Sequence, residues 1–167
     1  MPEAGKCEME QAALLDALQA SEERFRLAAD FAYDWEYWEG PDGRFVYVSP
    51  SCARITGYSA DEFIQDPQLF TRLVHPDDRE ILEGHRNQER NDPGAHRVTY
   101  RIVHRDGRER WIAHVCQRIY DPSGVWLGWR GSNRDITDHK QAGDALRESQ
   151  AKLQALFSIL PVGISIL

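Results

Sequence analysis

The sequence lacks both long apolar runs and an excess of basic residues. No stretch approaches the roughly 20 apolar residues that a membrane-spanning helix needs, and the opening MPEAGKCEME has no apolar signal-peptide core. The 20 Lys and Arg are outnumbered by 27 Asp and Glu, which gives a net charge of -7. A nucleic-acid-binding surface needs clustered Lys and Arg. We therefore expect a cytoplasmic chain without membrane insertion or nucleic-acid binding, while an anchor elsewhere in a longer parent protein stays open.

Cysteine is scarce, and the common catalytic signatures are missing. Cys7, Cys52 and Cys116 lie too far apart for a CxxC metal knuckle, and an odd number does not fit a disulfide framework. We expect reduced thiols and no metal site. The sequence contains no Gly-rich phosphate loop, no HExxH zinc motif and no Gly-x-Ser-x-Gly elbow. No catalytic residue is predicted, and this chain by itself is expected not to be an enzyme.

The middle of the chain alternates turn signals with short apolar segments, and 41% hydrophobic residues suffice for one compact core. Five segments have the β-branched and aromatic content of strands: 32–38, 44–49, 96–104, 108–120 and 125–134. Asp42-Gly43 is a hairpin signal between the first two. Between the second and third, Pro67 and Pro76 divide a helical composition into several short helices, one opened by a capping box from Ser59 to Glu62. This order predicts an α+β fold with an antiparallel sheet covered on one face by helices.

Both ends of the chain have the pattern of long amphipathic helices, over residues 9–29 and 135–160. Apolar side chains that recur in steps of three and four form a narrow seam on each helix, with these candidates for a dimer contact: Leu14, Leu18, Phe25, Leu146, Leu153 and Leu156. A narrow stripe favours a homodimer through coiled coils. A helix folded back on its own domain stays open, because the period does not distinguish the two.

Several short motifs occur in an order that resembles the PAS family, in the PAS-3-like sensory-box variant found in bacterial multidomain signalling proteins. The motifs are Ile55-Thr56-Gly57-Tyr58-Ser59-Ala60-Asp61-Glu62-Phe63, His75-Pro76-Asp77-Asp78-Arg79, Tyr100-Arg101-Ile102 with Arg105-Asp106-Gly107, and Asp135-Ile136-Thr137. The resemblance implies a PAS fold with a five-stranded antiparallel sheet, short flanking helices and an exit helix that leads to an output domain.

The resemblance also divides the chain into parts. We expect a linker helix at 1–29, the PAS domain at 30–137 and a signalling helix at 138–160. The pattern around Ala17 and Leu18 returns around Ala145 and Leu146, 128 residues later. Residues 161–167 are therefore interpreted as the truncated start of a second PAS-like domain.

In this family a ligand sits between the sheet and the helices, so the resemblance implies sensor side chains on the last two strands. The pocket candidates are Trp111, Ala113, Val115, Trp126 and Trp129. Ordinary core packing is the alternative, since aromatic residues dominate cores anyway. The cofactor is unknown: none is the first expectation, and a flavin or a haem stays open. His85 lies near the position of a haem ligand in some relatives, but its neighbours do not match them, so we expect it to be exposed to solvent.

Signal transmission is assigned by the resemblance to Asp135, Ile136 and Thr137, which join the last strand to the signalling helix. The expected function is a sensor of a small molecule or of redox state. It would act through coiled-coil helices on an output domain of the histidine kinase or diguanylate cyclase and phosphodiesterase type. The alternative is a ligand-free domain for dimerisation and relay.

Overall fold

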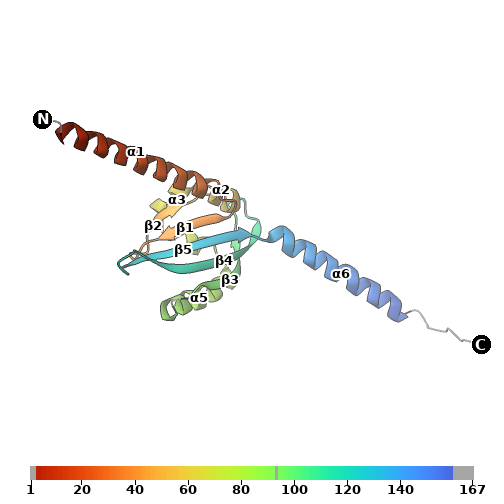
Figure 1. Cartoon of the computed structure of the whole chain (residues 1–167). Coiled ribbons are helices and arrows are strands. Elements are labelled where there is room, and N and C mark those ends of the chain that lie inside the picture. The colour runs from red at the N-terminus through yellow and green to blue at the C-terminus, as the bar shows by residue number, and fades with distance from the viewer. Residues whose placement is uncertain (1–2, 93, 160–167) are drawn as a thin grey trace, which may run out of the picture.

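The computed structural model describes residues 3–92 and 94–159, with the expected antiparallel sheet and short helices between two long terminal helices (Figure 1). The helices are α1 (Glu3–Asp30), α2 (Ser51–Thr56), α3 (Ala60–Gln65), α4 (Leu69–Leu73), the 3-10 helix η1 (Pro76–Asp78), α5 (Arg79–Asn91) and α6 (Thr137–Ile159). The strands are β1 (Trp35–Glu39), β2 (Phe45–Val48), β3 (His96–Val103), β4 (Glu109–Tyr120) and β5 (Trp126–Asp135).

The sheet has the strand order β2-β1-β5-β4-β3, and all neighbouring strands are antiparallel. The last strand therefore lies in the centre, between the first strand and the fourth. Because β5 pairs with β4 along its length and with β1 over residues 129–133, residues 35 and 133 become partners although they are far apart in sequence. The predicted α+β class with five antiparallel strands is confirmed.

Local signals in the sequence account for several of the turns and helix starts. Ser59 accepts the backbone N–H of Glu62 while the Glu62 side chain accepts that of Ser59, which is the predicted capping box. The β1–β2 turn passes through Gly43 with a positive φ of 77°, a conformation that glycine adopts without strain. His75 precedes η1 and accepts the N–H of Asp77 through Nδ1. The His-Pro-Asp-Asp motif thus shapes a helix start.

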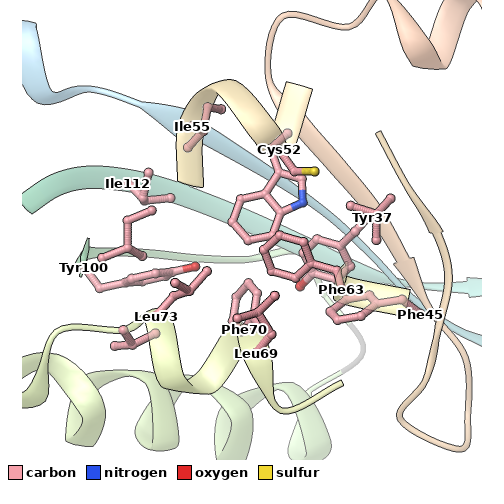
Figure 2. Packing of buried hydrophobic residues seen from close by; sticks show 14 of the residues in the cluster. Tyr37, Phe45, Cys52, Ile55, Phe63, Leu69, Phe70, Leu73, Tyr100 and Ile112 are labelled. Carbon is pink, nitrogen blue, oxygen red and sulfur yellow. The ribbon is translucent and has the colours of Figure 1, made fainter. Parts of the chain in front are cut away.

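The hydrophobic core lies between one face of the sheet and the short helices, and it contains a cluster of packed aromatic rings (Figure 2). The ring of Trp35 from β1 lies 4.9 Å from Phe63 of α3 and 5.5 Å from Phe70 of α4, centroid to centroid. Tyr37 lies over β5 at Gly131, where an added Cβ would come within 2.3 Å of the tyrosine ring. Only glycine leaves room for Tyr37 there.

The two long helices project away from the sheet in different directions (Figure 1). The six seam candidates on α1 and α6 are between 52% and 71% exposed. Neither helix is folded back over the core, so an apolar seam faces solvent on each. None of the helices in the described residues combines the length and the apolar content required to span a bilayer. Residues 161–167, interpreted as the start of a second domain, lie outside the described residues.

Candidate functional site

A cavity of about 260 Å³ lies between the sheet and the helices, and we call it the inner pocket. Its walls combine aromatic rings, such as Tyr37 and Phe70, with the polar side chains of His85, Arg86 and His114. The pocket therefore lies where the family resemblance implies a ligand, and its surface is mixed rather than purely apolar.

A cluster of three buried side chains, His85, His114 and Cys116, lies beside this pocket. His85 comes from α5, whereas His114 and Cys116 come from the same face of β4, two residues apart. Nε2 of His85 lies 3.3 Å from Sγ of Cys116. The three side chains are 4%, 3% and 1% exposed. The expectation of a solvent-exposed His85 is therefore wrong: α5 is amphipathic, and His85 lies on the same buried face as Leu82.

Asn133 of β5 holds the cluster from the sheet side. Its Oδ1 accepts a hydrogen bond of 3.1 Å from the Tyr100 hydroxyl and one of 2.9 Å from Nδ1 of His114. Asn133 is fully buried, and its Nδ2 has no hydrogen-bond partner among the described residues. A polar network of Tyr100, Asn133 and His114 is thus built into the sheet face of the core.

Most of the predicted pocket residues lie elsewhere. Side chains alternate along a strand, and on β4 the inward positions are Ile112, His114 and Cys116. The odd-numbered residues Trp111, Ala113 and Val115 therefore point to the other face of the sheet, and the prediction that they face the helices is wrong. Ala113 and Val115 line a shallow outer hollow instead. The prediction chose the odd-numbered residues of β4, which are the more apolar of its two alternating series. In this strand the more apolar series faces away from the helices.

The two predicted tryptophans of β5 differ in position. Trp129 lies on the inward face and lines the inner pocket. Trp126 is 38% exposed and packs edge-on against Trp129 with ring centroids 6.3 Å apart. The irregular pairing of β4 and β5 at Ile119 and Tyr120 lies beside it. Trp126 thus lies at the start of β5 opposite Tyr120, and it does not line the inner pocket.

The predicted transmission residues form a strand–helix junction with two residues of β4. The carboxylate of Asp135 accepts a 2.8 Å hydrogen bond from Arg110 and the N–H of Thr137 at 2.9 Å. The Thr137 hydroxyl oxygen accepts the N–H of Trp111 at 2.9 Å, and the Trp111 carbonyl accepts the N–H of Ile136 at 2.8 Å. The first turn of α6 is therefore bonded to β4 as well as to the end of β5.

Electrostatic interactions at this junction favour the ionised form of the Asp135 carboxyl. Burial opposes the ionisation of Asp135, but the hydrogen bonds from Thr137 and the charge of Arg110 outweigh burial and keep the pKa of the Asp135 carboxyl below its ordinary value. The ring of Trp111 also lies between two cations: Cζ of Arg101 is 5.5 Å and Nζ of Lys140 is 4.9 Å from its centroid. Trp111 thus contacts β3 and α6 at once.

The inner pocket fits neither of the large cofactors that the family resemblance leaves open. Pockets for drug-sized ligands measure about 300–1,000 Å³, and a flavin or a haem would need the rings of Tyr37, Phe63 and Phe70 to leave a packed core. Cys52 offers no reactive thiol, because burial raises its pKa to about 12. Only a small molecule or ion fits the arrangement as it stands.

Comparison with known proteins supports the family suggested by the motifs. The family model described as the PAS fold (PAS_3) matches residues 45–133. The uncharacterized protein y4lL of Sinorhizobium fredii is 31% identical over 77% of this chain and 15% of its own length. The methanogenesis regulatory histidine kinase FilI of Methanothrix harundinacea is 29% identical over 83% of this chain and 15% of its own.

A solved structure shows the same arrangement. A sensory box histidine kinase/response regulator from Burkholderia thailandensis matches with a TM-score of 0.59 and 30% identity, over 79% of this chain and 98% of that chain. By contrast, the chain spans only 15% to 18% of the length of the curated relatives it matches. The similarity therefore concerns one domain of much longer proteins.

Proposed function

Because the chain belongs to the PAS fold family, we propose that it is a sensory module in which a change at the inner pocket passes through the strand–helix junction to α6. The observation that carries this proposal is the double attachment of α6. Its first residue, Thr137, is bonded both to Trp111 of β4 and to Asp135 at the end of β5, and Asp135 is itself bonded to Arg110 of β4. His114 and Cys116, which face the pocket side of the sheet, lie on the same strand as Trp111. A shift of β4 would therefore move the start of α6.

The output domain lies in a longer parent protein in this proposal. A histidine kinase is favoured, because FilI and the Burkholderia protein carry that name, and a diguanylate cyclase or phosphodiesterase is the other output that the resemblance implies. Catalysis would then belong to that output domain and not to this chain. A cytoplasmic location is part of the same proposal, supported by Cys52 and Cys116, neither of which forms a disulfide.

We propose that the module works as a homodimer joined through α1 and α6. The exposed seam residues on both helices would lose contact with water in a coiled coil, and burial of each leucine side chain is worth about 1.5–3 kcal/mol. At its inner end, α1 is held on β2 by a 3.1 Å hydrogen bond from the Tyr47 hydroxyl to Asp30. Both helices are thus attached to the sheet at one end and available for pairing along the rest.

The relay is tested by Thr137→Val in the intact parent protein, with Thr99→Val on the exposed face of β3 as the matched control. Valine keeps the shape of threonine but cannot accept the Trp111 N–H. We expect the output response to stimulus to weaken or become constitutive in Thr137→Val and to stay normal in Thr99→Val. An unchanged response in Thr137→Val, with α6 shown by amide exchange to be loosened, would refute the relay.

A ligand-free relay is the second candidate, favoured by the aromatic rings that pack together in the core. An absorption spectrum and native mass spectrometry of the purified chain distinguish the two. A bound small molecule or ion of constant mass supports the sensor. A chain of bare polypeptide mass, unchanged after incubation with candidate ligands, supports the ligand-free relay.

A further inference from the structure

The cluster of His85, His114 and Cys116 has the composition of a metal site. One ligand atom of each side chain lies within 4.8 Å of the ligand atoms of the other two, and all three side chains are buried. We propose that this cluster, called the His₂Cys site from here on, binds a divalent transition-metal ion of the zinc class. The proposal does not depend on the signalling role of the domain.

The donor set selects the kind of metal. One thiolate and two imidazoles suit Zn²⁺ and its neighbours in the transition series, whereas Mg²⁺ and Ca²⁺ prefer oxygen ligands. With Zn–S of about 2.3 Å and Zn–N of about 2.0–2.1 Å, tetrahedral coordination places ligand atoms about 3.3–3.6 Å apart. Nε2 of His85 and Sγ of Cys116 already lie 3.3 Å apart. Side-chain movements on the order of 1 Å would bring the third ligand to the same separation.

Asn133 provides the outer support that metal-bound histidines need. A histidine ligand usually donates its second ring N–H to an oxygen, which fixes the tautomer and the ring orientation. Nδ1 of His114 has this partner in Oδ1 of Asn133, at 2.9 Å, so Nε2 is the nitrogen that would bind the metal. Tyr100 in turn holds Asn133 through its hydroxyl. The network already present in the sheet therefore orients one ligand.

The fourth coordination position faces the inner pocket. His85 and His114 both contribute to the wall of this cavity of about 260 Å³, and Arg86 lies on the same wall. Sites with three protein ligands and one open position take a water molecule or a small exogenous donor as the fourth ligand. On binding, Cys116 releases its thiol proton to solvent and each imidazole donates a nitrogen lone pair, so binding is accompanied by the loss of one proton.

Cobalt is the probe that tests this site, because Co²⁺ in a tetrahedral site with a thiolate has intense visible d–d bands and a near-ultraviolet thiolate-to-metal charge-transfer band. The reduced 167-residue chain, stripped with a chelator, is titrated with Co²⁺. We expect one Co²⁺ per chain with both signatures, and displacement by Zn²⁺. Cys116→Ser should lose the charge-transfer band. Cys52→Ser is the matched control at a buried thiol outside the site and should retain it.

Two results would overturn the proposal. The first is a folded wild-type chain whose Co²⁺ spectrum is only that of the hydrated ion. The second is a charge-transfer band that survives in Cys116→Ser. If Cys116→Ser does not fold, His85→Gln takes its place: loss of a direct ligand should weaken Co²⁺ binding by at least the roughly 10- to 100-fold that loss of an outer partner causes. Unchanged affinity in a folded His85→Gln chain counts against the site. Because these readouts measure binding alone, their failure leaves the proposed relay through α6 intact.

Discussion

The backbone N–H of Trp111 donates a hydrogen bond of 2.9 Å to Oγ1 of Thr137. This single bond joins β4 to the first residue of α6, 26 residues later in the chain. Because the Trp111 side chain also contacts Lys140 of α6, backbone and side chain of one residue both hold the helix start. The attachment of α6 therefore depends on β4 as much as on β5, from which the helix continues.

Loss of the Thr137 hydroxyl should loosen this attachment without unfolding the domain. Thr137→Val leaves a half-buried N–H of Trp111 without its acceptor, and such a loss costs about 1 kcal/mol in free energy of unfolding. Chemical denaturation measures this change, and hydrogen exchange should show a faster amide at Trp111. Thr99→Val should change neither quantity, because Thr99 is exposed on a strand. Equal exchange rates at Trp111 in both variants would contradict the importance of the bond.

Asp135 should make the stability of the junction depend on pH. Its pKa is lowered in the folded state, so the ionised carboxylate stabilises the fold at pH values above the unfolded pKa of about 3.9. This contribution declines as the pH falls below that value and through the lower folded pKa. Asp135→Asn should therefore be less stable than the wild type at neutral pH, by about 1–3 kcal/mol, because it loses a charged partner of Arg110.

The test is a comparison of the two unfolding free energies between neutral and acidic pH. The difference should shrink as the pH falls below about 4, where the wild-type carboxylate takes up a proton as well. A constant difference over this range would mean that the charge of Asp135 does not stabilise the junction.

The seam on α6 should determine the oligomeric state. Leu153→Glu places a charge at a seam position that is 52% exposed in the single chain, so it should not harm the fold but should prevent a coiled coil. Ala151→Glu adds the same side chain two residues away, about 200° around the helix at 3.6 residues per turn. Light scattering should give a dimer mass for the wild type and Ala151→Glu, and a monomer mass for Leu153→Glu. A wild-type chain that stays monomeric at high concentration would rule out the dimer.

Two glycines should respond in opposite ways to alanine. An added Cβ at Gly131 would lie 2.3 Å from the Tyr37 ring, and such overpacking costs about 1–3 kcal/mol. At Gly143 in α6 an added Cβ would meet nothing within 4 Å beyond the adjacent helix backbone, and alanine is the better helix former by about 1 kcal/mol. Gly131→Ala should lower the melting temperature, and Gly143→Ala should not. A neutral Gly131→Ala would show that Tyr37 can rearrange.

The local features of this protein could be predicted from its sequence because each depends on neighbouring residues. The Ser59–Glu62 capping box, the turn at Gly43 and the division of residues 50–91 into short helices all follow from side chains within a few positions of one another. The order of these signals also sufficed for the family resemblance, and hence for the five antiparallel strands and the place of the Asp135–Thr137 junction.

Local signals could not predict which side chains of β4 point toward the helices, and therefore could not predict the site beside this strand. A strand alternates its side chains, but its period of two does not say which series points inward. Trp111, Ala113 and Val115 form the more apolar series, yet the fold buries His114 and Cys116 instead. Those polar groups are acceptable in the core only because Asn133 and His85 provide partners from 19 and 31 residues away.

The sequence by itself thus determined the kinds and order of the elements, since propensities, caps and turns act over a few residues. The tertiary structure decided which side of β4 faces the helices, and it brought the side chains of His85, His114 and Cys116 together. The physical reason is that buried polar side chains need partners, and the partners of His114 and Cys116 come from β5 and α5, which pack against β4 only in the folded chain.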